Sequence, residues 1–157
     1  MRIIGIDPGT GILGFGVIDV FDNEIKCVDA GVIKTPPHQA DSDRLKTIFD
    51  ELKEIIEEHK PKVMAVEKLF FSKNVTTAMS VSQARGVVLL LGKQNKCELH
   101  EYNPMEIKQA LTGYGKATKQ QVQEMVRTVL KLKEIPKPDD AADALATAIT
   151  CSMSIKP

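Results

Sequence analysis

The sequence predicts a three-layer α/β domain, and three features of the chain support this prediction. Near the N-terminus, three short apolar segments are joined by short polar links, which is typical of an antiparallel meander. An amphipathic helical pattern then leads to a further apolar strand, as in a crossover connection. A second helix and strand repeat that order. A meander joined to a strand pair in this way makes a five-stranded mixed sheet flanked by helices.

The strands are predicted from apolar runs bounded by turn residues. The first run ends in Asp-Pro-Gly-Thr, and a polar link at residues 21–24 separates the second run from the third. The five predicted strands cover residues 2–7, 14–20, 24–34, 63–67 and 97–102.

The helices are predicted from apolar side chains that recur at three- and four-residue steps. They cover residues 41–59, 74–94, 103–111, 118–132 and 139–154. The segment Val87–Leu91 is apolar on every side, so it must be covered by the core or by a partner subunit.

Composition bounds the class of protein. The 157 residues suit one domain spanning 1–157, and an apolar fraction of 43% with 27% charged residues is ordinary for a globular protein. No apolar run approaches the roughly 18 residues of a membrane span, and Asp7 interrupts the N-terminal segment too early for a signal peptide. We therefore expect a cytoplasmic protein. The three cysteines are widely spaced, which argues against a disulfide framework and a zinc site.

Charge is unevenly distributed although the net charge is zero. Residues 1–67 carry 8 basic and 13 acidic side chains, and residues 68–137 carry 12 basic and 5 acidic ones. The last twenty residues, 138–157, carry one Lys and three Asp. This pattern predicts a positive face beside a negative cleft, although solvated helix surfaces explain it equally well.

Acidic residues end two of the predicted core strands. Asp7 closes the first strand and Glu67 closes the fourth, where neither has an obvious packing role. Such carboxylates converge if the two strands are neighbours, because open α/β sheets place their sites at the carboxyl ends of strands. Turn capping is the alternative for each residue taken alone.

A second acidic pair, Asp140 and Asp143, begins the last helix, and a spacing of three puts both side chains on one face. Helix capping is the competing explanation, with Asp140 as N-cap and Asp143 at the third helical position. If all four carboxylates gather, they need cations. Oxygen-only ligands favour Mg²⁺, with Mn²⁺ as a substitute, and two such ions are the usual means of hydrolysing a phosphodiester. Asp139 adds an acid whose part in metal binding spacing alone leaves open.

Residues 9–14 match the pattern G-x-G-x-x-G of dinucleotide-binding folds. Because a strand follows where that fold needs a helix, the match is a false positive. We interpret these glycines as a tight turn that permits close backbone approach, for example to a phosphate.

Basic residues gather in two regions where a DNA backbone could lie. Lys68, Lys73 and Arg85 follow Glu67, and Phe70 in the same loop is either a core residue or a wedge against unstacked bases. The residues around the turn at 113–115 are Lys108, Lys116, Lys119 and Arg127.

Five ordered blocks carry a family resemblance: Gly5–Thr10 with Gly14–Val17, Glu67–Phe70, Gln83–Gly86, Gly113–Val122 and Asp140–Ala146. Over nearly its whole length the chain resembles the RuvC family of Holliday-junction resolvases. The resemblance implies a ribonuclease H-like fold, a homodimer, and symmetric nicks that leave 5′-phosphate and 3′-hydroxyl ends at four-way junction DNA, in recombination and repair. It also implies action with RuvA and RuvB.

The resemblance also assigns roles to individual residues. Asp7, Glu67, Asp140 and Asp143 fall on the family's metal-binding catalytic acids. Phe70 falls on an aromatic at the junction branch point, and Lys108 and Lys119 on DNA-contacting positions.

Two other functions share parts of this pattern. A non-catalytic nucleic-acid-binding module on the same fold gains nothing from an acidic cluster near DNA. A phosphotransferase of the actin and sugar-kinase type also carries Asp-x-Gly-Thr, but it needs two such domains, and 157 residues hold one.

Overall fold

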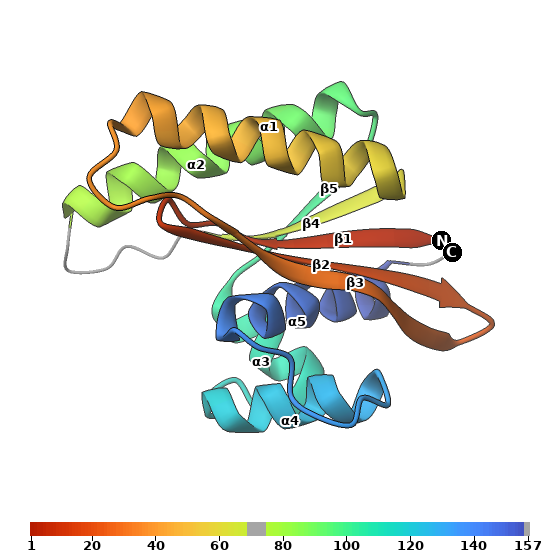
Figure 1. The fold of residues 1–157 in the computed structure, drawn as a ribbon. Helices are drawn as coiled ribbons and strands as arrows, with labels where there is room; N and C mark the ends of the chain where they lie inside the picture. Colours follow the sequence, from red (N-terminus) through yellow and green to blue (C-terminus); the bar gives the residue numbers. More distant parts are fainter. Residues whose placement is uncertain (69–74, 156–157) are drawn as a thin grey trace.

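The computed structural model describes residues 1–68 and 75–155, and within these residues one five-stranded sheet is covered by helices on both faces (Figure 1). The strands are β1 (Arg2–Asp7), β2 (Ile12–Phe21), β3 (Glu24–Lys34), β4 (Val63–Glu67) and β5 (Glu98–Tyr102). The helices are α1 (Asp41–His59), α2 (Val75–Gln94), α3 (Pro104–Thr112), α4 (Lys119–Val129) and α5 (Asp139–Ser154). The predicted three-layer α/β architecture is confirmed.

The sheet is mixed, in the order β3-β2-β1-β4-β5. The three N-terminal strands form the predicted antiparallel meander, and β4 and β5 continue the sheet parallel to β1. Ile6 of β1 pairs with Val66 of β4. The residues that follow them, Asp7 and Glu67, therefore lie side by side at the carboxyl ends of these two strands.

Alternation along β1 divides the interior into two cores. Ile4 and Ile6 point into the core beneath α1 and α2, whereas Ile3 points into the core formed with α3, α4 and α5. Figure 1 shows α1 and α2 on one face of the sheet and the other three helices on the opposite face. None of the helices in the described ranges could cross a membrane.

Helix α5 lies unusually close to β1 and β2 because the strands carry glycines beneath it. A Cβ on Gly5 would stand 2.1 Å from the carbonyl oxygen of Ala144, and a Cβ on Gly14 would stand 2.0 Å from that of Asp140. The expected close backbone approach is found at Gly14, but the approaching group is helix α5 and not a phosphate. Gly14 itself lies inside β2 and not in the predicted turn.

Two element boundaries differ from the sequence prediction by two residues or more, and the others agree within one residue. Strand β2 begins at Ile12, because Ile12 still pairs with Lys34 of β3. Helix α4 ends at Val129, since Lys131 adopts a positive φ of 54° that stops a helix.

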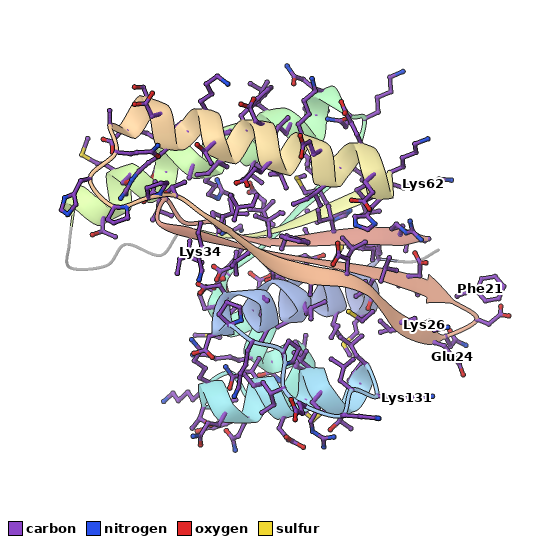
Figure 2. The ribbon with its side chains drawn as sticks, viewed as in Figure 1. Phe21, Glu24, Lys26, Lys34, Lys62 and Lys131 are labelled. Carbon is purple, nitrogen blue, oxygen red and sulfur yellow. The ribbon has the colours of Figure 1, made fainter. Side chains whose placement is uncertain are left out.

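A long hairpin joins β2 and β3. Asp22 and Asn23 both have positive φ, 48° and 64°, as the tightest hairpin turns require. Figure 2 shows Phe21 and Glu24 at its tip, pointing away from the layers. This tip lies beyond the amino end of β1, at the end of the sheet opposite to Asp7.

Candidate active site

Asp7 and Glu67 meet at the carboxyl ends of β1 and β4, where their side chains share a hydrogen bond. Burial raises the pKa of Asp7 from 3.8 to about 9, and the charges of Glu67 and Asp143 act in the same direction. A carboxyl group that keeps its proton this strongly stands in a site with an excess of negative charge.

Glu67 has charged neighbours of both signs. Burial raises the pKa of its carboxyl group, while the hydrogen bond with Asp7 and the ammonium groups of Lys108 and Lys119 oppose that rise. Glu67 is thus placed between a second carboxyl group and two cations.

The acids of α5 face the same point. Asp140 contributes to the raised pKa of Asp7 through its charge, and burial raises the pKa of Asp143, against the influence of Lys119. The capping explanation for this pair is wrong, because α5 begins at Asp139, its N-cap is Pro138, and no side chain caps it. Asp140 is inside the first turn, so its carboxylate is available to the cluster.

The additional acid, Asp139, lies at the exposed rim of the site, where it shares Lys119 with Asp143. Its side chain is 61% exposed and its nearest carboxylate oxygen lies 3.3 Å from the Lys119 ammonium. Asp140, by contrast, is partly buried and acts on Asp7. Of the two neighbours, Asp140 is therefore the one directed toward the other carboxylates.

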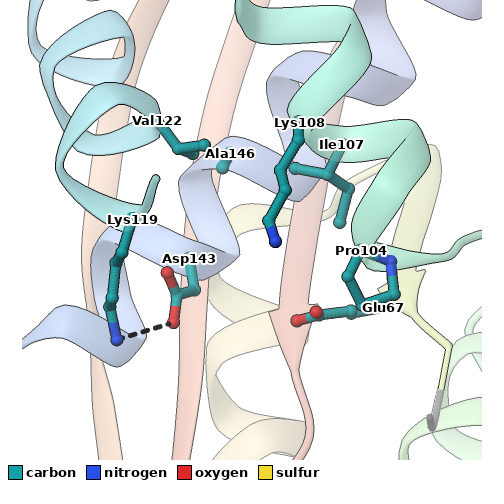
Figure 3. Close-up of a pocket in the computed structure, with 8 residues that line it drawn as sticks. All are labelled: Glu67, Pro104, Ile107, Lys108, Lys119, Val122, Asp143 and Ala146. Atoms are coloured by element: carbon teal, nitrogen blue, oxygen red, sulfur yellow. Dashed lines mark ion pairs between the residues drawn. The ribbon is translucent and has the colours of Figure 1, made fainter. Parts of the chain in front are cut away.

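Two cavities meet at Glu67. The first, of about 230 Å³, is lined by charged groups (Glu67, Lys108, Lys119, Asp143) and by an apolar wall (Pro104, Ile107, Val122, Ala146). Figure 3 shows the Lys108 side chain reaching between Asp143 and Glu67. The second cavity, of about 170 Å³, is lined by Asp7, Pro8, Glu67, Lys68, Val81, Arg85 and Pro104. Together they form a groove whose centre is acidic.

Lys119 is fixed at the rim of the first cavity by the start of α4. Thr118 and Gln121 form a capping box, so Lys119 is the first residue of the helix. Its ammonium lies 3.7 Å from Asp143, the ion pair drawn in Figure 3, and 3.3 Å from Asp139. Burial lowers the pKa of Lys119, but these carboxylates outweigh that effect and the pKa is raised.

The other predicted DNA contacts are placed unequally. Arg85 lines the second cavity, whereas Lys116 is exposed in the turn between α3 and α4 and lines neither cavity. Phe70 and Lys73 lie outside the described residues. Arg127 is engaged by Glu124 and by the carbonyl oxygen of Leu132.

The sequence prediction missed Glu101, which forms an ion pair with Arg85 at the edge of the second cavity. The sequence did contain a signal for Glu101. Glu101 is an acid near the carboxyl end of β5, which is parallel to β4, and Asp7 and Glu67 were singled out on the same ground.

The donor chemistry of the cluster fits a hard divalent cation, since all its candidate ligands are carboxylate oxygens. In the part of the chain that the structure describes, no three His, Cys, Asp or Glu side chains stand close enough to hold one ion. The cluster is instead balanced by a proton on Asp7 and by Lys119 against Asp143. Metal binding therefore requires release of that proton and rotation of side chains.

Comparison with known proteins identifies the family of this chain. The family model described as "Crossover junction endodeoxyribonuclease RuvC" matches residues 3–151. A protein of that name from Heliobacterium modesticaldum is 54% identical over 155 residues, which cover 99% of this chain and 96% of the relative. The chain belongs to the RuvC family.

Solved structures of the family and of more distant proteins share the fold. The structure of Thermus thermophilus RuvC in complex with a Holliday junction substrate superposes with a TM-score of 0.91. It is 37% identical in sequence, and the match covers 97% of this chain and 93% of the Thermus chain. The yeast mitochondrial resolvase Ydc2, 14% identical, matches with a TM-score of 0.68, over 94% of this chain and 76% of the yeast chain, and shows the likeness of fold alone.

Proposed function

We propose that this protein is a Mg²⁺-dependent endonuclease that resolves four-way DNA junctions by paired, symmetric nicks. The observation that carries the proposal is that Asp7, Glu67, Asp140 and Asp143, from three separate elements, lie near enough for their charges to act on one another, in a chain of the RuvC family. A pure binding module has no use for four carboxylates at its nucleic-acid surface, since they repel phosphate.

The four carboxylates are the groups that would hold the metal. Two Mg²⁺ ions, or Mn²⁺ in their place, would supply an activated water and would stabilise the leaving 3′ oxygen. Asp143 is now paired with Lys119, and Lys119 and Lys108 would neutralise the phosphates of the bound strand. Breaking the bond between the phosphorus and the 3′ oxygen leaves 5′-phosphate and 3′-hydroxyl ends.

The DNA strand follows the groove through the two cavities. Lys108 and Lys119 contact it at the first cavity, and Arg85 at the second. Lys116 contacts a neighbouring phosphate from the exposed turn. Lys73 and Phe70, which lie outside the described residues, are proposed as further DNA contacts from the sequence alone, with Phe70 at the branch point as the family resemblance implies. Such phosphate contacts set affinity and register.

A direct test uses a labelled immobile junction incubated with the protein and Mg²⁺, with mapping of the nicks. We expect nicks at symmetric positions in two opposing strands, with ends that a ligase can rejoin. Chelation should abolish cutting and Mn²⁺ should restore it, while linear duplex stays intact. Binding without cutting would support the non-catalytic module instead, and saturable nucleotide binding would support the phosphotransferase.

Paired nicks require two active sites, and we propose a homodimer formed through α2. Met79, Gln83, Gly86 and Leu90 are exposed at three- and four-residue steps, so they line one face of this helix. Leu90 is 53% exposed and Met79 is 63% exposed, so this face carries two large apolar side chains open to solvent, which a partner subunit could cover.

Leu90→Glu is expected to convert the dimer to a monomer, because it places two charges in an apolar contact, and to uncouple the two nicks. Sedimentation velocity gives the mass, and a cruciform plasmid distinguishes single from paired nicking. Val28→Glu, an exposed apolar residue of β3, is the matched control and should leave the dimer intact. A parent protein that stays monomeric at high concentration would contradict the proposal.

The remaining assignments follow from the same proposal. A junction resolvase acts on chromosomal DNA during homologous recombination and DNA repair, which places the protein in the cytoplasm. The family resemblance adds RuvA and RuvB as the branch-migration partners. Co-purification of the three proteins on an immobilised junction tests this assembly.

A further inference from the structure

The second cavity contains a cationic group, proposed above as a DNA contact, whose target phosphate and positioning are still undefined. Arg85, from α2, and Lys68, directly after β4, line it together with Asp7 and Glu67. The first cavity, with Lys108 and Lys119, also has Glu67 in its wall. Cations therefore stand on both sides of the carboxylates along one groove.

Glu101 of β5 forms an ion pair with the Arg85 guanidinium. The Nη2 of Arg85 donates to the Oε1 of Glu101, and the Arg85 side chain is 20% exposed while that of Glu101 is 37% exposed. This contact joins a helix to the sheet over a separation of 16 residues in the chain. It fixes the plane of the guanidinium, which a flexible side chain does not fix by itself.

The Nε of Arg85 is buried and finds no hydrogen-bond acceptor within residues 1–68 and 75–155. Native proteins leave few buried donors unpaired, and each one needs a reason. An ion pair that served only to join α2 to β5 would not require a second, unpaired hydrogen-bond donor, the Nε, on the same side chain. The ion pair with Glu101 therefore leaves part of the hydrogen-bonding capacity of the guanidinium unused within the described part of the chain.

We propose that Arg85 binds a DNA phosphate adjacent to the scissile one, on the side opposite Lys108 and Lys119, and that Glu101 is the positioning residue that aims it. This inference rests on the proposed nuclease function and deepens it. A guanidinium suits the task because its planar fork matches two oxygens of one phosphate. The strand is then gripped on both sides of the carboxylates, which holds the scissile phosphate over the metal site.

The first test is single-turnover cleavage of a junction by Arg85→Met, Arg85→Lys, Glu101→Gln and Glu101→Ala. We expect Arg85→Met to slow cleavage about 100-fold and Arg85→Lys to recover little of it, because an ammonium lacks the fork. Glu101→Ala should slow cleavage about tenfold with junction affinity changed less than about twofold, since positioning acts on rate rather than on binding. Glu101→Gln should fall between Glu101→Ala and the parent, because its amide oxygen still accepts the bond.

The second test identifies the phosphate. Single phosphates on either side of the nick are replaced by neutral methylphosphonates, and each junction is cut by the parent and by Arg85→Met. At one position the replacement should slow the parent about tenfold and leave the Arg85→Met rate unchanged, because the contact is already lost. Glu101→Ala should show a reduced effect at that same position.

Controls separate the possible failures. Lys53→Met on α1 removes one positive charge outside both cavities, and Glu98→Gln changes an acid at the other end of β5. Both should cut as the parent does. The inference would be overturned if the effects of Arg85→Met and of the methylphosphonate multiplied independently at every position. Cleavage by Glu101→Ala at the parent's rate would overturn it as well. A parent that fails to cut the junction would instead overturn the proposed function.

Discussion

Replacement of Asp7 by Asn is expected to lower junction cleavage about 1,000-fold or more while junction binding persists. Asp7 lies beside the other carboxylates, and burial together with the charges of Glu67 and Asp143 raises its pKa. An amide cannot carry the negative charge that a divalent cation needs from this position. The groove and its lysines stay in place, so the DNA contacts are kept.

The same substitution is expected to stabilise the metal-free protein. The pKa of Asp7 in the folded protein is about 9, above its ordinary value of 3.8, so the folded state binds this proton more tightly than the unfolded chain does. Asp7 therefore costs no stability at low pH and lowers the free energy of unfolding as the pH rises from about 4 to about 9. Asn removes that cost, and we expect the unfolding midpoint at pH 8 to rise by about 4 °C or more.

Two measurements check the predicted effects of Asp7→Asn on cleavage and on stability. Mapped cleavage of a junction gives the activity, and thermal unfolding between pH 5 and pH 9 with a chelator gives the stability. The parent should lose stability with rising pH and regain it when Mg²⁺ is added, whereas Asp7→Asn should respond weakly to either. Asp50→Asn, an exposed residue of α1 paired with Lys46, is the isosteric control. Unchanged cleavage by Asp7→Asn would refute the assignment of the site.

The architecture was predictable because its signals are local. Apolar runs that end in an acid mark β1 and β4, and parallel pairing of two such strands brings Asp7 and Glu67 together whatever the details of packing. The face shared by Asp140 and Asp143 follows from helix geometry alone. These features depend on spacings that can be counted in the sequence.

Features that depend on contacts between distant segments were not predictable. The ion pairs of Lys119 with Asp139 and Asp143 require α4 and α5 to lie against each other. The pairing of Arg85 with Glu101 requires α2 to pass over the end of β5. Asp140 was mistaken for a possible cap because the start of a helix cannot be fixed to one residue from its pattern.

The glycines beneath α5 provide the strongest structural prediction. Gly14→Ala would place a Cβ 2.0 Å from the carbonyl oxygen of Asp140, which is backbone and cannot rotate away. Helix α5 must then lift from β2 at the point where it presents Asp140. We expect the free energy of unfolding to fall by about 2–3 kcal/mol and cleavage to fall about 100-fold, although every carboxylate is still present.

A graded series distinguishes displacement of α5 from general damage. Gly16→Ala first meets the side chain of Leu145, at 2.6 Å, which can shift, so its losses should be smaller. Gly11→Ala meets nothing within 4 Å and serves as the matched control, with stability and cleavage near those of the parent. Thermal unfolding and single-turnover cleavage rank the three variants. If Gly14→Ala cut junctions as fast as Gly11→Ala, the close approach of α5 to the sheet would not be what holds Asp140 and Asp143 at the site. The expected order, in which both losses decrease from Gly14→Ala through Gly16→Ala to Gly11→Ala, ties the catalytic geometry to a strand position that carries no functional group.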